Sequence, residues 1–133
     1  MKTYKLTSQD RELIKLARDM SKNHKIDTRQ VACDVGCALI TKKGNIYKGI
    51  NIESKLSGPT SICSETAAIA SMISNGEKSI NTIACVYENK GKTNVMQPCG
   101  SCRHVISQFG DPFVIISKDK KVKLNALYPL PIK

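Results

Sequence analysis

Three cysteines and one glutamate form the part of this sequence that is best suited to metal chemistry. Cys63 and Glu65 belong to a C-x-E segment, and Cys99 and Cys102 belong to a P-C-x-x-C segment that begins at Pro98. Thiolates are good zinc ligands, and three protein ligands leave a fourth tetrahedral position open for water, as in catalytic sites. Glu65 is not needed as a ligand, so it is well placed to move protons beside that water. The pattern therefore predicts one zinc ion per chain.

The expected local structure brings the two segments to one place. Cys99 and Cys102 lie three positions apart at the start of an expected helix, so their sulfurs share a face. Cys63 begins a different expected helix. The partial positive charge of both helix N-termini should lower the pKa values of these thiols and favour metal binding.

A structural zinc site closed by a fourth cysteine is the alternative. Cys37 and Cys85 lie within apolar stretches and are expected to be small core residues, which leaves Cys33 as the only credible fourth ligand. Such a closed site would leave the position of Glu65 unexplained. Neither histidine is expected to bind the metal, because three thiols already supply a ligand set.

Length and composition limit the class of protein. The 133 residues are enough for one domain with a single core, expected to span residues 1–133. A net charge of +10 makes nucleic acid worth considering as a partner. However, only 5% of the residues are aromatic and tryptophan is absent, so few side chains are available to stack on bases. Nucleic acid is therefore not the expected partner.

Cysteine usage and the N-terminus indicate the compartment. Six cysteines in a short chain would suggest disulfides only in an oxidising environment. Residues 1–5 are not followed by the apolar run of a signal peptide, and no segment is long enough to cross a bilayer. We expect a cytoplasmic protein with free thiols and no membrane partner.

Hydrophobic periodicity and helix-end signals predict three helices and five strands. Thr7 and Asp10 resemble a capping box at the start of a helix over about residues 8–22. A second helix is expected from Cys63 to Gly76, and a third from Pro98 to Gly110. The strands are expected at residues 35–40, 46–52, 80–87, 112–117 and 121–124, with the intervening segments 53–62 and 88–97 as loops.

The order of these elements predicts an α/β fold. The short turn after the first strand requires an antiparallel hairpin, and the helix between the third and fourth strands makes that pair parallel. The final short turn brings the fifth strand back antiparallel. We therefore expect a three-layer α/β/α domain around a mixed five-stranded sheet, with the strand at 35–40 covered on both faces.

The motifs resemble those of the small zinc-dependent cytidine deaminases that act on free nucleosides. The resemblance implies that Asn51 and Glu53 hydrogen-bond the ribose hydroxyls, although these two residues would also suit the polar end of a strand. It further implies a homo-oligomer, most simply a tetramer, and a role in pyrimidine salvage. It covers about residues 13–130 and rests on four segments, Val35-Gly36-Cys37-Ala38-Leu39, Gly49-Ile50-Asn51-Ile52-Glu53, Cys63-Ser64-Glu65 and Pro98-Cys99-Gly100-Ser101-Cys102-Arg103.

Two positions depart from the usual pattern of that family. Thr66 follows Glu65 where family members usually carry an arginine, and Cys33 stands where a phenylalanine usually lines the pyrimidine pocket. A related branch, which resembles blasticidin S deaminase, also lacks the arginine but does not share the pairing of Asn51 with Glu53. The reaction is therefore better predicted than the preferred substrate.

We expect a zinc-dependent hydrolase that converts cytidine or deoxycytidine to uridine or deoxyuridine and releases ammonia. Cys63, Cys99 and Cys102 would hold the zinc, Glu65 would move protons, and Arg103 would offset the charge of the thiolates through hydrogen bonds. The alternatives are a deaminase of blasticidin S or another cytosine nucleoside analogue, a polynucleotide deaminase, and a non-catalytic module stabilised by zinc.

Overall fold

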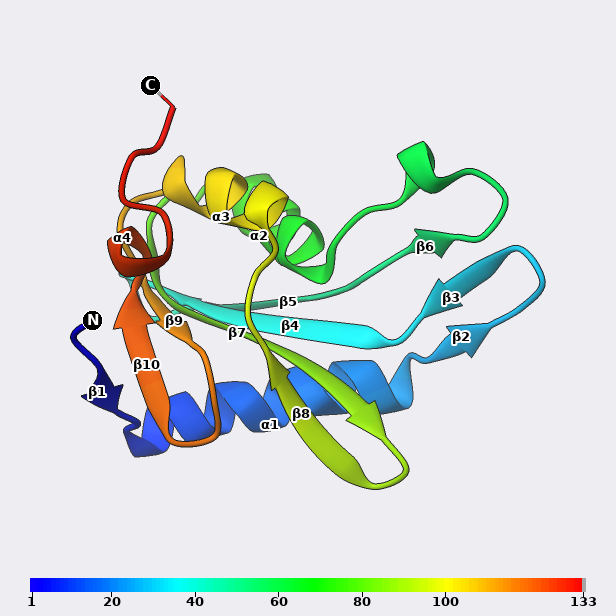
Figure 1. Ribbon diagram of the computed structural model, residues 1–133, viewed down its shortest axis with the longest axis horizontal. Coiled ribbons are helices and arrows are strands. Elements are labelled where there is room, and N and C mark those ends of the chain that lie inside the picture. Colours follow the sequence, from blue (N-terminus) through cyan, green and yellow to red (C-terminus); the bar gives the residue numbers. More distant parts are fainter. Residues whose placement is uncertain (133) are drawn as a thin grey trace.

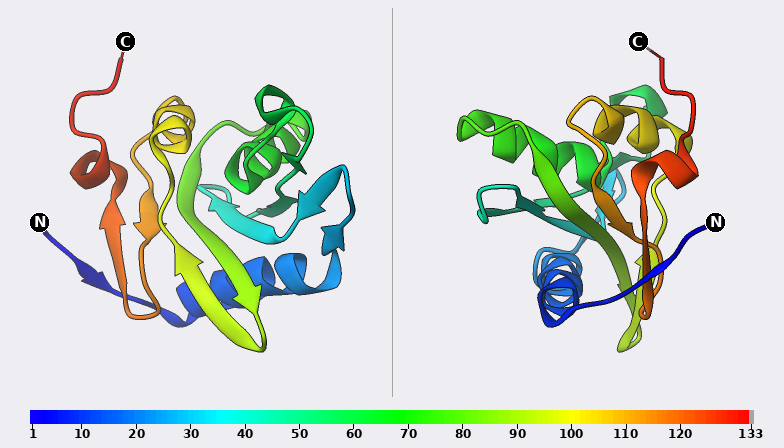
Figure 2. Two further views of the ribbon diagram at one scale, coloured as in Figure 1. Left: turned by 45° about the vertical axis from the view of Figure 1, so that its right-hand side comes forward. Right: turned by 90° about the vertical axis from the view of Figure 1, so that its left-hand side faces the viewer.

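Helix α1 (Ser8–Asn23) covers one face of a mixed sheet, and helices α2 (Ser64–Ser74) and α3 (Gly100–Ser107) cover the opposite face. This arrangement is seen in a computed structural model that describes residues 1–132 (Figure 1), and two further views show the same three layers (Figure 2). The predicted α/β/α class is confirmed. A short helix α4 (Leu124–Leu127) and a 3-10 turn η1 (Gly58–Thr60) complete the helical elements of the described residues. No helix within residues 1–132 is both long and apolar enough to span a membrane.

The main sheet has seven strands instead of the predicted five. Their order is β1-β10-β9-β7-β4-β5, with β8 paired to β7 beside this path. As predicted, β4 is antiparallel to β5, β7 is parallel to β9, and β9 is antiparallel to β10. The strands are β1 (Tyr4–Lys5), β4 (Val35–Thr41), β5 (Ile46–Ile50), β7 (Ile80–Asn89), β8 (Lys92–Met96), β9 (Phe113–Ile115) and β10 (Lys120–Lys123).

Strand β8 lies in the segment that was predicted to be a polar loop. It forms an antiparallel hairpin with β7 in which Asn89 is paired with Lys92, so the loop consists of Lys90 and Gly91 alone. Both loop residues have positive φ, 50° for Lys90 and 78° for Gly91, as a type I′ hairpin turn requires. Gly91 is a turn signal in the sequence, but the polar residues of the strand that follows led to the prediction of a loop.

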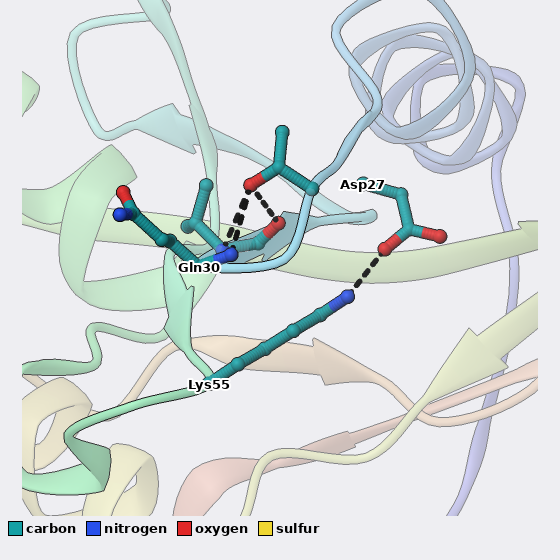
Figure 3. Close-up of polar contacts among 5 residues, drawn as sticks. Asp27, Gln30 and Lys55 are labelled. Atoms are coloured by element: carbon teal, nitrogen blue, oxygen red, sulfur yellow. Dashed lines mark hydrogen bonds and ion pairs between the residues drawn. The ribbon is translucent and has the colours of Figure 1, made fainter.

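A small three-stranded sheet, β2-β3-β6, extends the molecule beyond one end of β4 and β5 (Figure 1). Its strands are β2 (Ile26–Asp27), β3 (Val31–Cys33) and β6 (Glu53–Ser54). The segment of β6 was predicted to be part of a loop. An ion pair of 2.5 Å joins Lys55 Nζ to Asp27 Oδ1 (Figure 3). The Gln30 carbonyl accepts a hydrogen bond from the Lys55 amide. These contacts fix β6, whose first residue is Glu53.

Two glycines let the helices approach the sheet closely. A Cβ atom at Gly36 would lie 2.1 Å from the carbonyl oxygen of Ala17 in α1. A Cβ atom at Gly49 would lie 2.4 Å from the Ala68 amide nitrogen and 2.7 Å from the Ser64 carbonyl oxygen. No other residue type fits at Gly49 unless α2 moves. The first turn of α2, which carries Glu65, is therefore held at a fixed distance from β5.

The core lies between the helices and both faces of the sheet. Beneath α2 and α3, the buried cluster contains Cys37, Leu39, Ala68, Ile69, Met72, Ile80, Ile83, Ile106, Val114 and Leu124. Beneath α1, a second buried cluster contains Leu6, Leu13, Ala17, Ala38, Ile40, Ala84, Val86 and Ile115.

The predicted capping box at the start of α1 is confirmed, with Thr7 and Asp10 exchanging hydrogen bonds of 2.9 and 3.2 Å.

Candidate metal centre

The sulfurs of Cys63, Cys99 and Cys102 lie within 4.8 Å of one another. Cys63 is the N-cap residue of α2 and Cys99 is that of α3, while Cys102 lies in the first turn of α3. In a tetrahedral site with a Zn–S distance of about 2.3 Å, two sulfurs are about 3.8 Å apart. The cluster therefore fits a zinc ion after small side-chain adjustments. Cys33, the possible fourth ligand, does not belong to the cluster and is buried on β3.

The three thiols differ in how readily they lose a proton. Interaction with the backbone amide of Cys102 lowers the pKa of Cys99, and the Ser101 amide acts in the same direction. Burial raises the pKa values of Cys63 and Cys102 above the ordinary value for a thiol. The prediction that both helix N-termini lower the thiol pKa values therefore holds for Cys99 only. For the other two thiols the loss of solvation outweighs the helix termini, and a bound cation is needed to favour the thiolate.

Glu65 lies beside the cysteines in the first turn of α2 and is only 6% exposed. Its Oε1 atom accepts a hydrogen bond of 3.1 Å from the Ser64 hydroxyl. The Ser64 Oγ atom is in turn 3.2 Å from the Cys85 Sγ atom on β7. Cys85 is buried, as expected for a core residue, but it also lines the pocket in front of Glu65. Ser64 and Cys85 were not predicted to belong to the site. The only sequence feature that could have indicated them is the hydroxyl side chain between Cys63 and Glu65.

A pocket of about 280 Å³ opens next to the cluster, which is a size suited to a small molecule. Cys33 does not line it, although the resemblance assigns that position to the wall of the pyrimidine pocket. Its side chain is buried on β3 instead. The pocket combines apolar and polar side chains, namely Val35, Ile52, Ile62, Met96, Asn51, Glu53, Ser61, Ser64, Gln97, Glu65 and three cysteines at 63, 85 and 99.

Asn51 and Glu53 both reach the pocket, but their surroundings differ. The Oδ1 atom of Asn51 accepts hydrogen bonds from the amides of Asp34 (2.8 Å) and Val35 (2.9 Å), which ties the end of β5 to the bend between β3 and β4. Its Nδ2 atom donates to Asp34 Oδ1 at 3.3 Å, so one amide hydrogen is left for a ligand. The exposed carboxylate of Glu53 makes none of the hydrogen bonds or ion pairs found within residues 1–132.

Arg103 contacts backbone carbonyls instead of sulfurs. Its Nε atom donates to the Pro98 carbonyl at 2.9 Å, and one terminal nitrogen donates to the Leu127 carbonyl at 3.0 Å. The expected hydrogen bonds to the ligands are not among its contacts. Arg103 instead fixes the residue that precedes Cys99 and the end of α4. His104 pairs with the Tyr128 hydroxyl at 3.1 Å and does not belong to the cysteine cluster.

Known proteins resemble this chain in sequence and in fold. A family profile described as "Cytidine and deoxycytidylate deaminase zinc-binding region" matches residues 7–118. Blasticidin-S deaminase of Bacillus cereus is 35% identical over 140 residues, which cover 100% of this chain and 97% of that protein. A cytidine deaminase of Sporosarcina psychrophila is 39% identical over 75 residues, which cover 56% of this chain and 52% of that protein.

A solved structure has the same fold as this chain over almost its whole length. The crystal structure of cytidine deaminase from Mycobacterium leprae matches 94% of this chain and 100% of its own, with a TM-score of 0.76 and 23% sequence identity. At this level of identity the match shows a common fold.

Proposed function

This chain belongs to the family of zinc-binding cytidine and deoxycytidylate deaminases, and from that membership we propose that it hydrolyses cytidine and deoxycytidine to uridine and deoxyuridine. The observation that carries the proposal is the cluster of three sulfurs within 4.8 Å, with the buried carboxylate of Glu65 on the wall of the adjoining pocket. A zinc ion that only stabilised the fold would not need a carboxylate and an open pocket beside it.

Cys63, Cys99 and Cys102 are the proposed zinc ligands. A zinc ion held by these residues would supply the nucleophile, because zinc lowers the pKa of a coordinated water towards neutrality. The ordinary thiol pKa is too high for all three sulfurs to ionise unaided, so the helix amides around Cys99 and the cation act together. Arg103 supports the site through the Pro98 carbonyl and thereby keeps Cys99 in place.

Glu65 is the proposed proton carrier. Its carboxylate takes a proton from the attacking water and delivers it to the ring nitrogen of the base, which prepares the ring carbon for addition. A carbon–oxygen bond forms, Glu65 then takes the remaining proton of the added hydroxyl and passes it to the amino group, and the carbon–nitrogen bond breaks so that ammonia leaves and the carbonyl of the product forms. Asn51 and Glu53 line the same pocket and are proposed to hold the sugar hydroxyls, with Asn51 donating its remaining amide hydrogen and Glu53 accepting.

Deamination of blasticidin S is the second candidate function. The similarity to blasticidin-S deaminase of Bacillus cereus covers 97% of that protein, whereas the match to the Sporosarcina psychrophila cytidine deaminase covers 52%. Thr66 stands in place of the arginine that cytidine deaminases usually carry, and the blasticidin S branch also lacks that arginine. Both candidates use the same chemistry at a cytosine ring, so they differ only in the sugar and its substituents.

We further propose a homo-oligomer, with a tetramer favoured, and a cytoplasmic role in pyrimidine salvage. The exposed apolar side chains Leu130 and Ile132, which are 88% and 78% exposed, support a subunit contact near the C-terminus. Three thiols that must stay reduced to bind metal suit a reducing compartment. Light scattering at assay concentration tests the oligomer, and an active monomer would exclude it.

A substrate panel assayed for ammonia tests the proposed function. The zinc-loaded protein is incubated with cytidine, deoxycytidine, blasticidin S and a short single-stranded oligonucleotide. Turnover of cytidine and deoxycytidine, with none of the oligonucleotide, is the expected result. Preferential turnover of blasticidin S would establish the second candidate, and turnover of the oligonucleotide would overturn the choice of a free nucleoside. A protein with full zinc and no ammonia from any substrate would be a non-catalytic module.

A further inference from the structure

We propose that Ser64 and Cys85 are positioning residues that hold the Glu65 carboxylate in its reactive orientation. The proposal rests on the proposed function of Glu65 and goes beyond it, because it explains how one particular rotamer of that side chain is selected. Neither residue is a zinc ligand in the cysteine cluster.

The three side chains form a continuous hydrogen-bonded chain. Ser64 Oγ is 3.1 Å from Glu65 Oε1 and 3.2 Å from Cys85 Sγ. All three residues are buried, with 1% exposure for Ser64 and 6% for each of the other two. Water therefore has little access to replace either contact, and an unsatisfied polar group would be costly in this environment.

The chemistry of the groups fixes the direction of the hydrogen bonds. The Ser64 hydroxyl donates to Glu65 Oε1, and a hydroxyl has only one hydrogen to donate. The hydrogen in the contact between Ser64 and Cys85 must then come from the thiol. Burial raises the pKa of Cys85 well above its ordinary value, which agrees with a protonated donor. Cys85 thus orients the Ser64 hydroxyl, and Ser64 orients the carboxylate.

The consequence for catalysis is that one carboxylate oxygen is anchored and the other is left for the pocket. The terminal torsion of a glutamate is broad, so an unanchored carboxylate samples many orientations. Proton transfer needs heavy atoms within hydrogen-bond distance, and a displacement of about 1 Å can cost roughly 100-fold in rate. The anchor also spans two layers, since Ser64 begins α2 and Cys85 lies in the middle of β7.

A role confined to core packing makes a different prediction. In that case removal of the Ser64 hydroxyl would lower the melting temperature and leave the turnover of the folded protein unchanged. The comparison must therefore separate kcat from KM and from stability. Cys37 offers a matched control, because it is fully buried, faces Cys85 across the β4–β7 pair and does not line the pocket.

The experiment measures kcat, KM, zinc content and melting temperature for Ser64→Ala, Cys85→Ala, the double variant, Cys85→Ser and Cys37→Ala, with cytidine as substrate. Ser64→Ala should keep its zinc and its KM and lose kcat roughly 10–100-fold. Cys85→Ala should lose less, and should lose nothing further in the Ser64→Ala background, because Cys85 acts through Ser64. Cys85→Ser should retain most of the kcat because a hydroxyl also donates, and Cys37→Ala should change only stability.

Wild-type kcat in a zinc-loaded Ser64→Ala variant, or additive losses in the double variant, would overturn the proposal. Crystal structures of the zinc-loaded wild type and Ser64→Ala provide a readout that does not depend on activity. The Glu65 carboxylate should have one orientation in the wild type and several in the variant. An inactive wild type would overturn the proposed function, whereas an equally ordered carboxylate in both proteins would overturn the positioning role.

Discussion

Replacement of Asn51 by alanine should destabilise the fold as well as weaken substrate binding. Asn51 Oδ1 accepts hydrogen bonds from two backbone amides, those of Asp34 and Val35, at 2.8 and 2.9 Å. The substitution leaves both donors without this acceptor at a partly buried strand junction. An unsatisfied donor costs about 1–3 kcal/mol, and partial access of water places each near the lower end, so we expect a total loss of about 2–3 kcal/mol. For a chain of this size that corresponds to a fall in melting temperature of roughly 6–15 °C.

Glu53→Ala is the matched control for this prediction. Glu53 lines the same pocket two residues further on, but its carboxylate is exposed and makes no contact that the fold requires. Its loss should leave the melting temperature unchanged and lower kcat/KM for cytidine by roughly 10–150-fold. Thermal unfolding followed by circular dichroism, together with cytidine kinetics, measures both effects. An Asn51→Ala variant that melts like the wild type would refute the structural role of this side chain and leave it only a role in sugar binding.

Three further predictions concern the ligands, the packing of α2 and a buried carboxylate. Cys102→Ser should lose most of its zinc by metal analysis, while Cys37→Ser keeps it, and equal occupancy in both would mean that the ligand set is wrong. Gly49→Ala should destabilise the protein by about 1–3 kcal/mol because its new methyl group meets the α2 backbone. Gly58→Ala should not destabilise it, because a methyl group there would have no atom within 4 Å. Equal urea midpoints for the two variants would argue against a close contact at Gly49. Hydrogen bonds from Tyr47 and other nearby side chains lower the pKa of Glu77 below its ordinary value of 4.5. The stability that the Glu77 carboxylate contributes is therefore fully present above pH 4.5 and is lost as the pH falls through the lowered pKa of Glu77. Urea unfolding between pH 3 and pH 7 should show that the free energy of unfolding depends less on pH in Glu77→Gln than in the wild type. The same pH dependence in both proteins would mean that Glu77 does not cause it.

Local sequence signals were sufficient to predict the three longer helices and the main strand pairings, but not α4 or η1. The capping box of Thr7 and Asp10 and the stop at Gly76 depend on residues that are close in the chain, and the structure contains both. The gathering of Cys63, Cys99 and Cys102 could also be anticipated, because each residue sits at the start of a predicted helix. The assignment of these three residues as zinc ligands stays a prediction.

Contacts between residues that are distant in the chain were not predictable. The Ser64–Cys85 pair depends on how α2 lies over β7, and the hydrogen bonds from Asp34 and Val35 to Asn51 depend on the bend between β3 and β4. Strand β8 was missed because its polar residues show no alternation that marks a buried face. The residues missed at the site are therefore those whose partners only the tertiary structure brings near.

The proposed chemistry is tested most directly by the release of ammonia from cytidine and deoxycytidine, measured for the wild type and for Glu65→Gln at equal zinc content. The amide of the variant cannot take up and deliver a proton, although it can occupy the same space beside the Ser64 hydroxyl. We predict that the wild type releases ammonia and that the variant does so about 10²–10⁴-fold more slowly, or slower still. Turnover by Glu65→Gln close to that of the wild type would contradict the assignment of Glu65 as the proton carrier.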